Sequence, residues 1–160
     1  MKYAKIKKND TVNCDDGIAV SLFMQGCPHH CPECWNPETW NPADGKEISK
    51  DNLIKELKND ISANGIKRNF SILGGEPFVG YNINDTKDIV YAIKDAFPNI
   101  KIIIWTGYTI EELQTIDVAK QILSKIDILI DGRYVKEKRD ITLKLRGSSN
   151  QRILRRGVDF

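Results

Sequence analysis

The stretch IAVSLFMQGCPHHCPECWN, residues 18–36, joins an apolar run to a loop that holds three cysteines. The apolar run at residues 18–24 has the length and composition of a buried strand. Cys27, Cys31 and Cys34 follow it within eight residues, in a chain that has four cysteines. Because thiolates are soft metal ligands, the pattern predicts a metal site at the end of this strand.

Further apolar runs alternate with stretches of helical period, which is the pattern of parallel βα units. A complete (β/α)8 barrel takes roughly 250 residues, and this chain has 160. We therefore predict an α/β fold: a partial, laterally open (β/α) barrel of about five or six mostly parallel strands. Residues 1–160 contain no repeat, low-complexity segment or linker and are expected to form a single domain. The other strands are predicted at residues 70–73, 100–105, 126–130 and, more weakly, 141–145.

The segments between these runs carry helix signals. Residues 49–63 place apolar side chains at helical intervals, with Ser49 as the N-cap. A second helix is predicted at about residues 85–97, before Pro98. A third begins at Thr109, where Thr-Ile-Glu-Glu has the form of a capping box. Residues 2–16 are expected to form an edge hairpin.

Composition limits the possible partners and compartments. The chain is 41% hydrophobic and 29% charged with a formal charge of +2, which suits one soluble domain and does not suggest a nucleic-acid binder. No apolar run approaches the ~20 residues of a membrane span, and the basic start lacks the core of a signal peptide. We expect a cytoplasmic protein with no nucleic-acid or membrane partner. In a reducing compartment, clustered cysteines are more often metal ligands or redox groups than disulfides.

The cysteines alone leave three interpretations open. Three ligands in one loop leave one coordination position vacant, so a [4Fe-4S] cluster bound there would have one iron free for an incoming ligand. A zinc ion completed by His29, His30 or Cys14 is the second interpretation. Buried thiols without a metal are the third.

Polar or glycine-rich segments also follow the other main predicted strands. They are Gly-Gly-Glu-Pro at 74–77, Thr-Gly-Tyr at 106–108 and Asp-Gly-Arg-Tyr at 131–134. In parallel βα folds the loops after the strands converge on one rim. Two successive glycines let the backbone approach a ligand closely.

A Cx3Cx2C loop after the first strand and Gly-Gly-Glu-Pro after the second resemble the radical S-adenosylmethionine (SAM) superfamily. The resemblance implies that the three cysteines hold a [4Fe-4S] cluster and that the amino and carboxylate groups of SAM take the vacant iron. It also implies that Gly74, Gly75 and Glu76 hold the SAM amino group. Many members have an aromatic residue just before the third cysteine, whereas this chain has Glu33 there and its aromatic residue at Trp35; both are expected near the adenine. Asp131 is either a cap for a following turn or an acceptor for the SAM ribose or ammonium.

The blocks CPECWNPETW, WTGY, LIDGRY and LRGSSNQR are together similar to the small anaerobic ribonucleoside-triphosphate reductase activating proteins. This resemblance implies hydrogen abstraction from a glycine of the reductase, with an electron donor such as reduced flavodoxin. The alternatives are an activase of another glycyl-radical enzyme, an enzyme acting on a small heterocycle as the deazaguanine synthases do, or a non-catalytic zinc or iron-sulfur module. Arg133 is expected to contact the SAM carboxylate or the partner. The LRGSSNQR block, residues 145–152, is either a polar loop or a contact to cofactor or partner.

Overall fold

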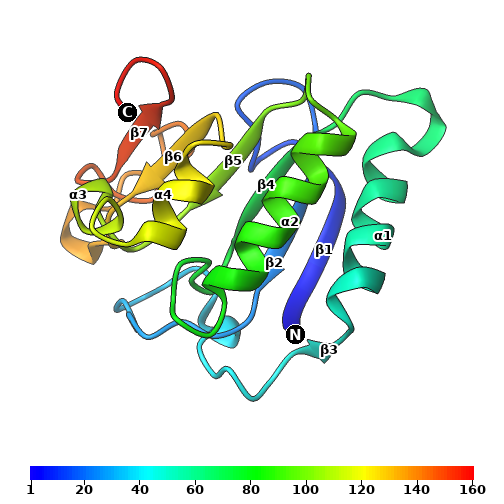
Figure 1. The fold of residues 1–160 in the computed structure, drawn as a ribbon. Helices are drawn as coiled ribbons and strands as arrows, with labels where there is room; N and C mark the ends of the chain where they lie inside the picture. Colours follow the sequence, from blue (N-terminus) through cyan, green and yellow to red (C-terminus); the bar gives the residue numbers. More distant parts are fainter.

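The computed structural model describes residues 1–160 as a seven-stranded mixed sheet with helices α1, α2 and α4 on one face (Figure 1). The order of the strands across the sheet is β3-β1-β2-β4-β5-β6-β7. In chain order they are β1 (Lys2–Asp10), β2 (Ala19–Met24), β3 (Lys46–Glu47), β4 (Asn69–Gly74), β5 (Ile102–Trp105), β6 (Ile128–Asp131) and β7 (Arg152–Arg155).

The centre of the sheet is parallel and its flanks are antiparallel. Strands β2, β4, β5 and β6 pair in parallel, whereas β1, β3 and β7 join by antiparallel pairing. The predicted α/β class with parallel strands is therefore confirmed for the centre, but the sheet has seven strands rather than five or six. The sheet does not close on itself, because its two edge strands are β3 and β7.

Local signals in the sequence account for the helix boundaries. Ser49 caps α1 by accepting a hydrogen bond from the Asn52 N–H at 3.3 Å, as predicted. The capping box at Thr109 is also present: the N–H of Thr109 donates to Glu112 Oε2 at 2.7 Å, and the N–H of Glu112 donates to Thr109 Oγ1 at 3.3 Å. The predicted second helix begins two residues earlier than expected. The α-helices are α1 (Lys50–Ser62), α2 (Ile83–Ala96), α3 (Ile110–Leu113) and α4 (Asp117–Leu123), and short 3-10 turns lie at Pro37–Thr39, Ala63–Gly65 and Lys136–Lys138.

The main core lies between the helices and the sheet and joins 24 buried residues, among them Leu53, Phe70 and Ile104. A small second cluster, Ile103, Ile128 and Ile130, packs on the opposite face. Strand β2 is buried along its whole length, which explains its continuous apolar run. None of the helices combines the length and apolar character that crossing a bilayer requires.

Two predicted elements are wrong. Residues 141–145 form turns rather than a strand: Ile141 is exposed, and Leu145 has a positive φ of 60° that interrupts extended backbone. The strand that pairs with β6 is β7. Residues 2–16 do not form a hairpin by themselves, because Lys2–Asp10 is one strand whose antiparallel partner is β2.

Asp10 at the end of β1 is expected to make the free energy of unfolding depend on pH in the acid range. Its carboxylate has no exposed surface and accepts from the N–H of Val12 at 2.9 Å and from Asn13 Nδ2 at 2.7 Å. Burial acts to raise the pKa of Asp10, but these donors together hold it at about 2, below its ordinary value of 3.8. The stabilisation is therefore complete above pH ~4 and is lost as the pH falls toward 2.

We expect Asp10→Asn to lower the free energy of unfolding by about 2 kcal/mol at pH 7. Urea unfolding of both proteins at pH 7, 4 and 2.5 measures the difference. The gap between wild type and variant should shrink at the lowest pH. A gap of the same size at pH 7 and pH 2.5 would contradict this assignment.

Candidate active site

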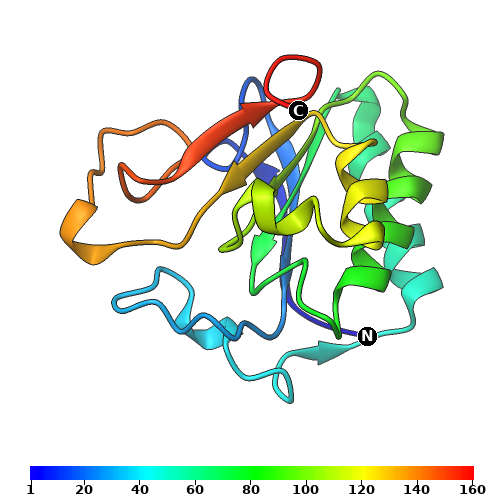
Figure 2. The same cartoon turned by 60° about the vertical axis from the view of Figure 1, so that its left-hand side comes forward.

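Four loops follow the carboxyl ends of the parallel strands and meet at one rim of the sheet. The strand register places Met24 beside Gly74 and Trp105 beside Ile130, so the four strand ends are neighbours. Figure 2 shows the loops after β2 and β6 extending from this rim on the side away from the helices. The predicted convergence of the four motifs is confirmed.

The three cysteines lie in a loop that closes on itself. The N–H of Cys27 donates to the carbonyl of Trp40 at 3.0 Å, which ties the start of the loop to its end. Inside the loop, the N–H of Cys34 donates to the carbonyl of Cys31 at 3.0 Å. Glu33, between these two cysteines, has a positive φ of 58°, a conformation that side-chain-bearing residues seldom adopt. One tight loop therefore carries all three thiols.

The three thiols influence one another electrostatically. Burial raises the pKa of the Cys27 thiol to about 11, the N–H of His29 opposes this, and the negative charges of Glu76, Cys31 and Cys34 raise it further. Burial also raises the pKa of Cys31, and the negative charge of Cys34 raises it further. Three thiolates that interact in this way destabilise one another unless a cation lies between them, so the donor set fits a cationic iron centre.

The donors do not form a site for a single metal ion. No three His, Cys, Asp or Glu side chains lie close enough to surround one metal ion. In a cubane cluster each thiolate binds a different iron, so its ligands stand further apart than those of zinc. All four cysteines are free thiols.

Cys14 is not part of this loop. It is buried before β2, and its thiol donates to the carbonyl of Asp16 at 2.7 Å. Cys14 is therefore a buried free thiol outside the motif. His30 also turns away, because its ring stacks on Trp40 with the ring centroids 4.7 Å apart.

The Gly74–Gly75 turn packs directly against the start of the cysteine loop. Gly74 has a positive φ of 95°, and a Cβ on Gly75 would lie 2.5 Å from the carbonyl oxygen of Gly26. The N–H of Gly75 donates to Met24 at 2.9 Å, and the N–H of Glu76 donates to Gly26 at 2.8 Å. Both positions therefore exclude side chains, and the two loops meet backbone to backbone.

Glu76 lies at the centre of a buried hydrogen-bond network. Only 1% of its surface is exposed. Oε1 accepts from the N–H of Phe78 at 3.0 Å and from Thr106 Oγ1 at 2.8 Å. Oε2 accepts from the N–H of Gly107 at 2.8 Å and is 2.9 Å from His29 Nε2. The side chain thus joins the loops that follow β2, β4 and β5.

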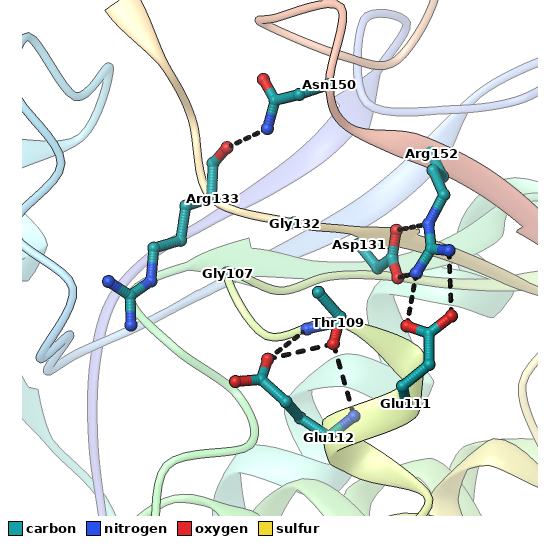
Figure 3. Close-up of a pocket in the computed structure, with 9 residues that line it drawn as sticks. All are labelled: Gly107, Thr109, Glu111, Glu112, Asp131, Gly132, Arg133, Asn150 and Arg152. Atoms are coloured by element: carbon teal, nitrogen blue, oxygen red, sulfur yellow. Dashed lines mark hydrogen bonds and ion pairs between the residues drawn. The ribbon is translucent and has the colours of Figure 1, made fainter.

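A polar cavity of about 500 Å³ opens at the same rim (Figure 3). Asp131 lies on its wall, is 1% exposed, and accepts from the N–H of Ile110 at 2.8 Å and from Arg152 Nε at 2.9 Å. Arg152 also binds the exposed Glu111 and holds the pKa of that carboxyl at about 2. Because it accepts from the N–H of Ile110, Asp131 caps the first turn of α3. None of the nine lining residues is hydrophobic or a cysteine: Gly107, Thr109, Glu111, Glu112, Asp131, Gly132, Arg133, Asn150 and Arg152.

Arg133 is the unpaired cation of this cavity. Its side chain forms no salt bridge within the chain, and in Figure 3 its guanidinium points away from the Asp131–Arg152 pair. Burial and the negative charge of Cys34 raise the pKa of Cys31, and the positive charge of Arg133 acts in the opposite direction. Arg133 thus lies between the cavity and the cysteine loop and is available to an anion.

Glu33 and Trp35 lie on a separate, smaller cavity of about 220 Å³, which Tyr134 and Arg139 complete. Trp35 is 60% exposed, and the Arg139 guanidinium lies 5.8 Å from its ring centroid. Glu33 pairs with Lys136 at 2.7 Å. The structure thus places these two residues together, apart from the Asp131 cavity.

The LRGSSNQR block braces the loop after β6. Gln151 donates from Nε2 to the carbonyl of Gly132 at 3.0 Å, and Asn150 donates from Nδ2 to the carbonyl of Arg133 at 2.8 Å. The block is therefore a structural support that also supplies Asn150 and Arg152 to the cavity wall.

Comparison with known proteins agrees with this geometry. A family model described as "4Fe-4S single cluster domain" matches residues 15–154. Proteins named "Anaerobic ribonucleoside-triphosphate reductase-activating protein" match nearly the whole chain. That of Escherichia coli (strain K12) is 36% identical over 152 residues, 94% of this chain and 96% of the relative. That of Enterobacteria phage T4 is 37% identical, over 96% of this chain and 93% of the relative. That of Vibrio cholerae is 35% identical, over 97% of this chain and 98% of the relative.

The cysteine loop and the family match define the class of protein as a single-cluster 4Fe-4S protein. Within that class, the chain belongs to the family of anaerobic ribonucleoside-triphosphate reductase-activating proteins.

Proposed function

We propose that the chain is a radical SAM activating enzyme, with one [4Fe-4S] cluster on Cys27, Cys31 and Cys34, that generates a glycyl radical on anaerobic ribonucleoside-triphosphate reductase. The observation that carries this proposal is the packing of the three-cysteine loop on the Gly74–Gly75 turn. Cys27, Cys31 and Cys34 would hold the cluster, which would supply the one electron for reductive cleavage of SAM and so the means to remove a hydrogen atom from the reductase glycine. The protein binds and orients the reactants and excludes water.

The Gly74–Glu76 turn is the proposed site for the SAM amino group. The carbonyl of Gly75 accepts no hydrogen bond within the chain, so it is free to accept one from an ammonium. Both oxygens of the Glu76 carboxylate already accept from this chain's own donors, so Glu76 contributes by holding the turn. Arg133, which has no partner of its own, is placed to bind the SAM carboxylate.

The remaining contacts to SAM are assigned to the two cavities. Asp131, at the wall of the larger cavity, is proposed to face the ribose. Glu33 and Trp35 are proposed to meet the adenine, because they flank Cys34 and line the smaller cavity. The exposed ring of Trp35 offers a face for stacking.

A protein substrate suits the open architecture. The sheet has free edges at β3 and β7. We propose that residues 1–160 form one domain whose sheet is a laterally open part of a (β/α) barrel. A loop of the reductase would enter from the open side and present its glycine. Reduced flavodoxin or a similar donor would supply the electron. The free thiols and such a cluster suit the reducing cytoplasm.

The decisive experiment mixes anaerobically reconstituted protein, SAM and a reductant with the reductase and records the electron paramagnetic resonance (EPR) spectrum. We expect a carbon-centred radical on the reductase and stoichiometric 5′-deoxyadenosine. A signal only with a formate-lyase type enzyme would favour the alternative activase. Colourless protein that contains zinc and leaves SAM intact would favour a non-catalytic module.

A further inference from the structure

His29 lies inside the cysteine loop but makes its contacts outside it. Its side chain is 4% exposed, and its Nε2 lies 2.9 Å from Glu76 Oε2. The ring also meets Tyr108 edge to face, with the ring centroids 4.7 Å apart. Along the chain the same residue lies two positions after Cys27. One residue therefore connects a proposed cluster ligand with the turn proposed to bind SAM.

The imidazole of His29 differs in kind from the other contacts of the Glu76 carboxylate. Its other three donors are the hydroxyl of Thr106 and the N–H groups of Phe78 and Gly107, all of them uncharged. His29 is the only basic side chain that contacts this buried carboxylate. Because buried carboxylates are stable only when fully hydrogen-bonded, the pair constrains both loops.

Gly107 provides the space that the ring occupies. A Cβ at this position would lie 2.6 Å from His29 Nε2, so any larger residue would displace the imidazole. The φ of Gly107 is not in the left-handed region, so alanine is compatible with its backbone. Gly107→Ala is therefore a way to move His29 without changing His29 itself.

We propose that His29 is a positioning residue whose bond to Glu76 holds the cysteine loop and the Gly74–Glu76 turn in one fixed arrangement. This inference rests on the proposed function, since it concerns the distance between the cluster and the SAM amino group. It predicts that the cluster assembles without the imidazole but that SAM meets it in the wrong geometry. Mutating a comparable partner behind a metal ligand costs about ten- to a hundredfold in metal affinity or activity.

The test uses the reconstituted full chain as wild type, His29→Ala, His29→Gln, Gly107→Ala and His30→Asn. The Gln amide keeps a donor for Glu76. His30 is exposed and has a positive φ of 46°, which asparagine tolerates, so His30→Asn is the matched control. Three measurements are made on each protein: iron content, SAM affinity by titration, and the change that SAM causes in the EPR spectrum of the reduced cluster.

We expect His29→Ala and Gly107→Ala to keep their iron, to bind SAM about tenfold more weakly or worse, and to lose the SAM-induced spectral change. His29→Gln should recover most of both properties, and His30→Asn should match wild type. Wild-type affinity and spectrum in His29→Ala would overturn the inference while leaving the proposed function intact. Loss of iron in His29→Ala, with Gly107→Ala like wild type, would also overturn it, because His29 would then be holding the cluster. Failure of wild type to bind SAM would overturn both proposals.

Discussion

Replacing Cys27 with alanine is expected to abolish cluster assembly and reductase activation while leaving the fold largely intact. Cys27 is one of three ligands in a loop that offers no fourth cysteine, because Cys14 lies elsewhere and donates to Asp16. Two thiols cannot retain a cubane that three hold with one iron already open. Cys27 is only partly buried, so we expect a change in unfolding free energy of about 1 kcal/mol or less.

The measurements are iron and sulfide content, the absorbance of the reconstituted protein, and the glycyl radical signal of the reductase. Cys14→Ala is the matched control. Because the Cys14 thiol is buried, this substitution should lower the free energy of unfolding by about 1 kcal/mol. The variant should keep its full iron content and full activation of the reductase. A normal radical signal in Cys27→Ala would refute the cluster assignment. Loss of the cluster in Cys14→Ala would show that the fourth cysteine is a ligand after all.

Where periodicity and capping chemistry act locally, the sequence predicts the fold well. The strands at β2, β4, β5 and β6 are short apolar runs that the sheet buries, and the caps at Ser49 and Thr109 depend on residues only three positions away. Periodicity does not predict strand β7, because Arg-Ile-Leu-Arg has little apolar length and is specified by pairing with β6. The run at 141–145 alternates like a strand, but its backbone forms turns, with Leu145 at a positive φ of 60°.

The candidate site divides in the same way. The cysteine spacing and the paired glycines are local patterns, and their backbone contact follows from two neighbouring parallel strands. The network around Glu76 joins positions 30 and 47 residues apart, which no local pattern reports. For Asp131 the sequence leaves two roles open, and its bonds to Ile110 and Arg152 become visible only in the fold.

Arg152→Met is expected to destabilise the protein more than any other surface substitution near the cavity. The guanidinium binds two carboxylates in different surroundings: Asp131, whose side chain is 1% exposed, and Glu111, which is 64% exposed. Removing Arg152 leaves the buried Asp131 with one remaining donor, the N–H of Ile110. Losing one partner of a buried pair costs several kcal/mol, and because Arg152 is itself partly exposed we expect about 2–3 kcal/mol.

Glu111→Gln separates the two halves of this interaction, since it weakens only the exposed half. Exposed ion pairs contribute little to stability, so Glu111→Gln should unfold close to wild type. Arg152→Met should lower the melting temperature by roughly 5–10 °C, measured by calorimetry on the same buffer and protein concentration. Equal losses in the two variants would mean that the exposed pair carries the stability, and the buried Asp131 would then be held by α3 alone.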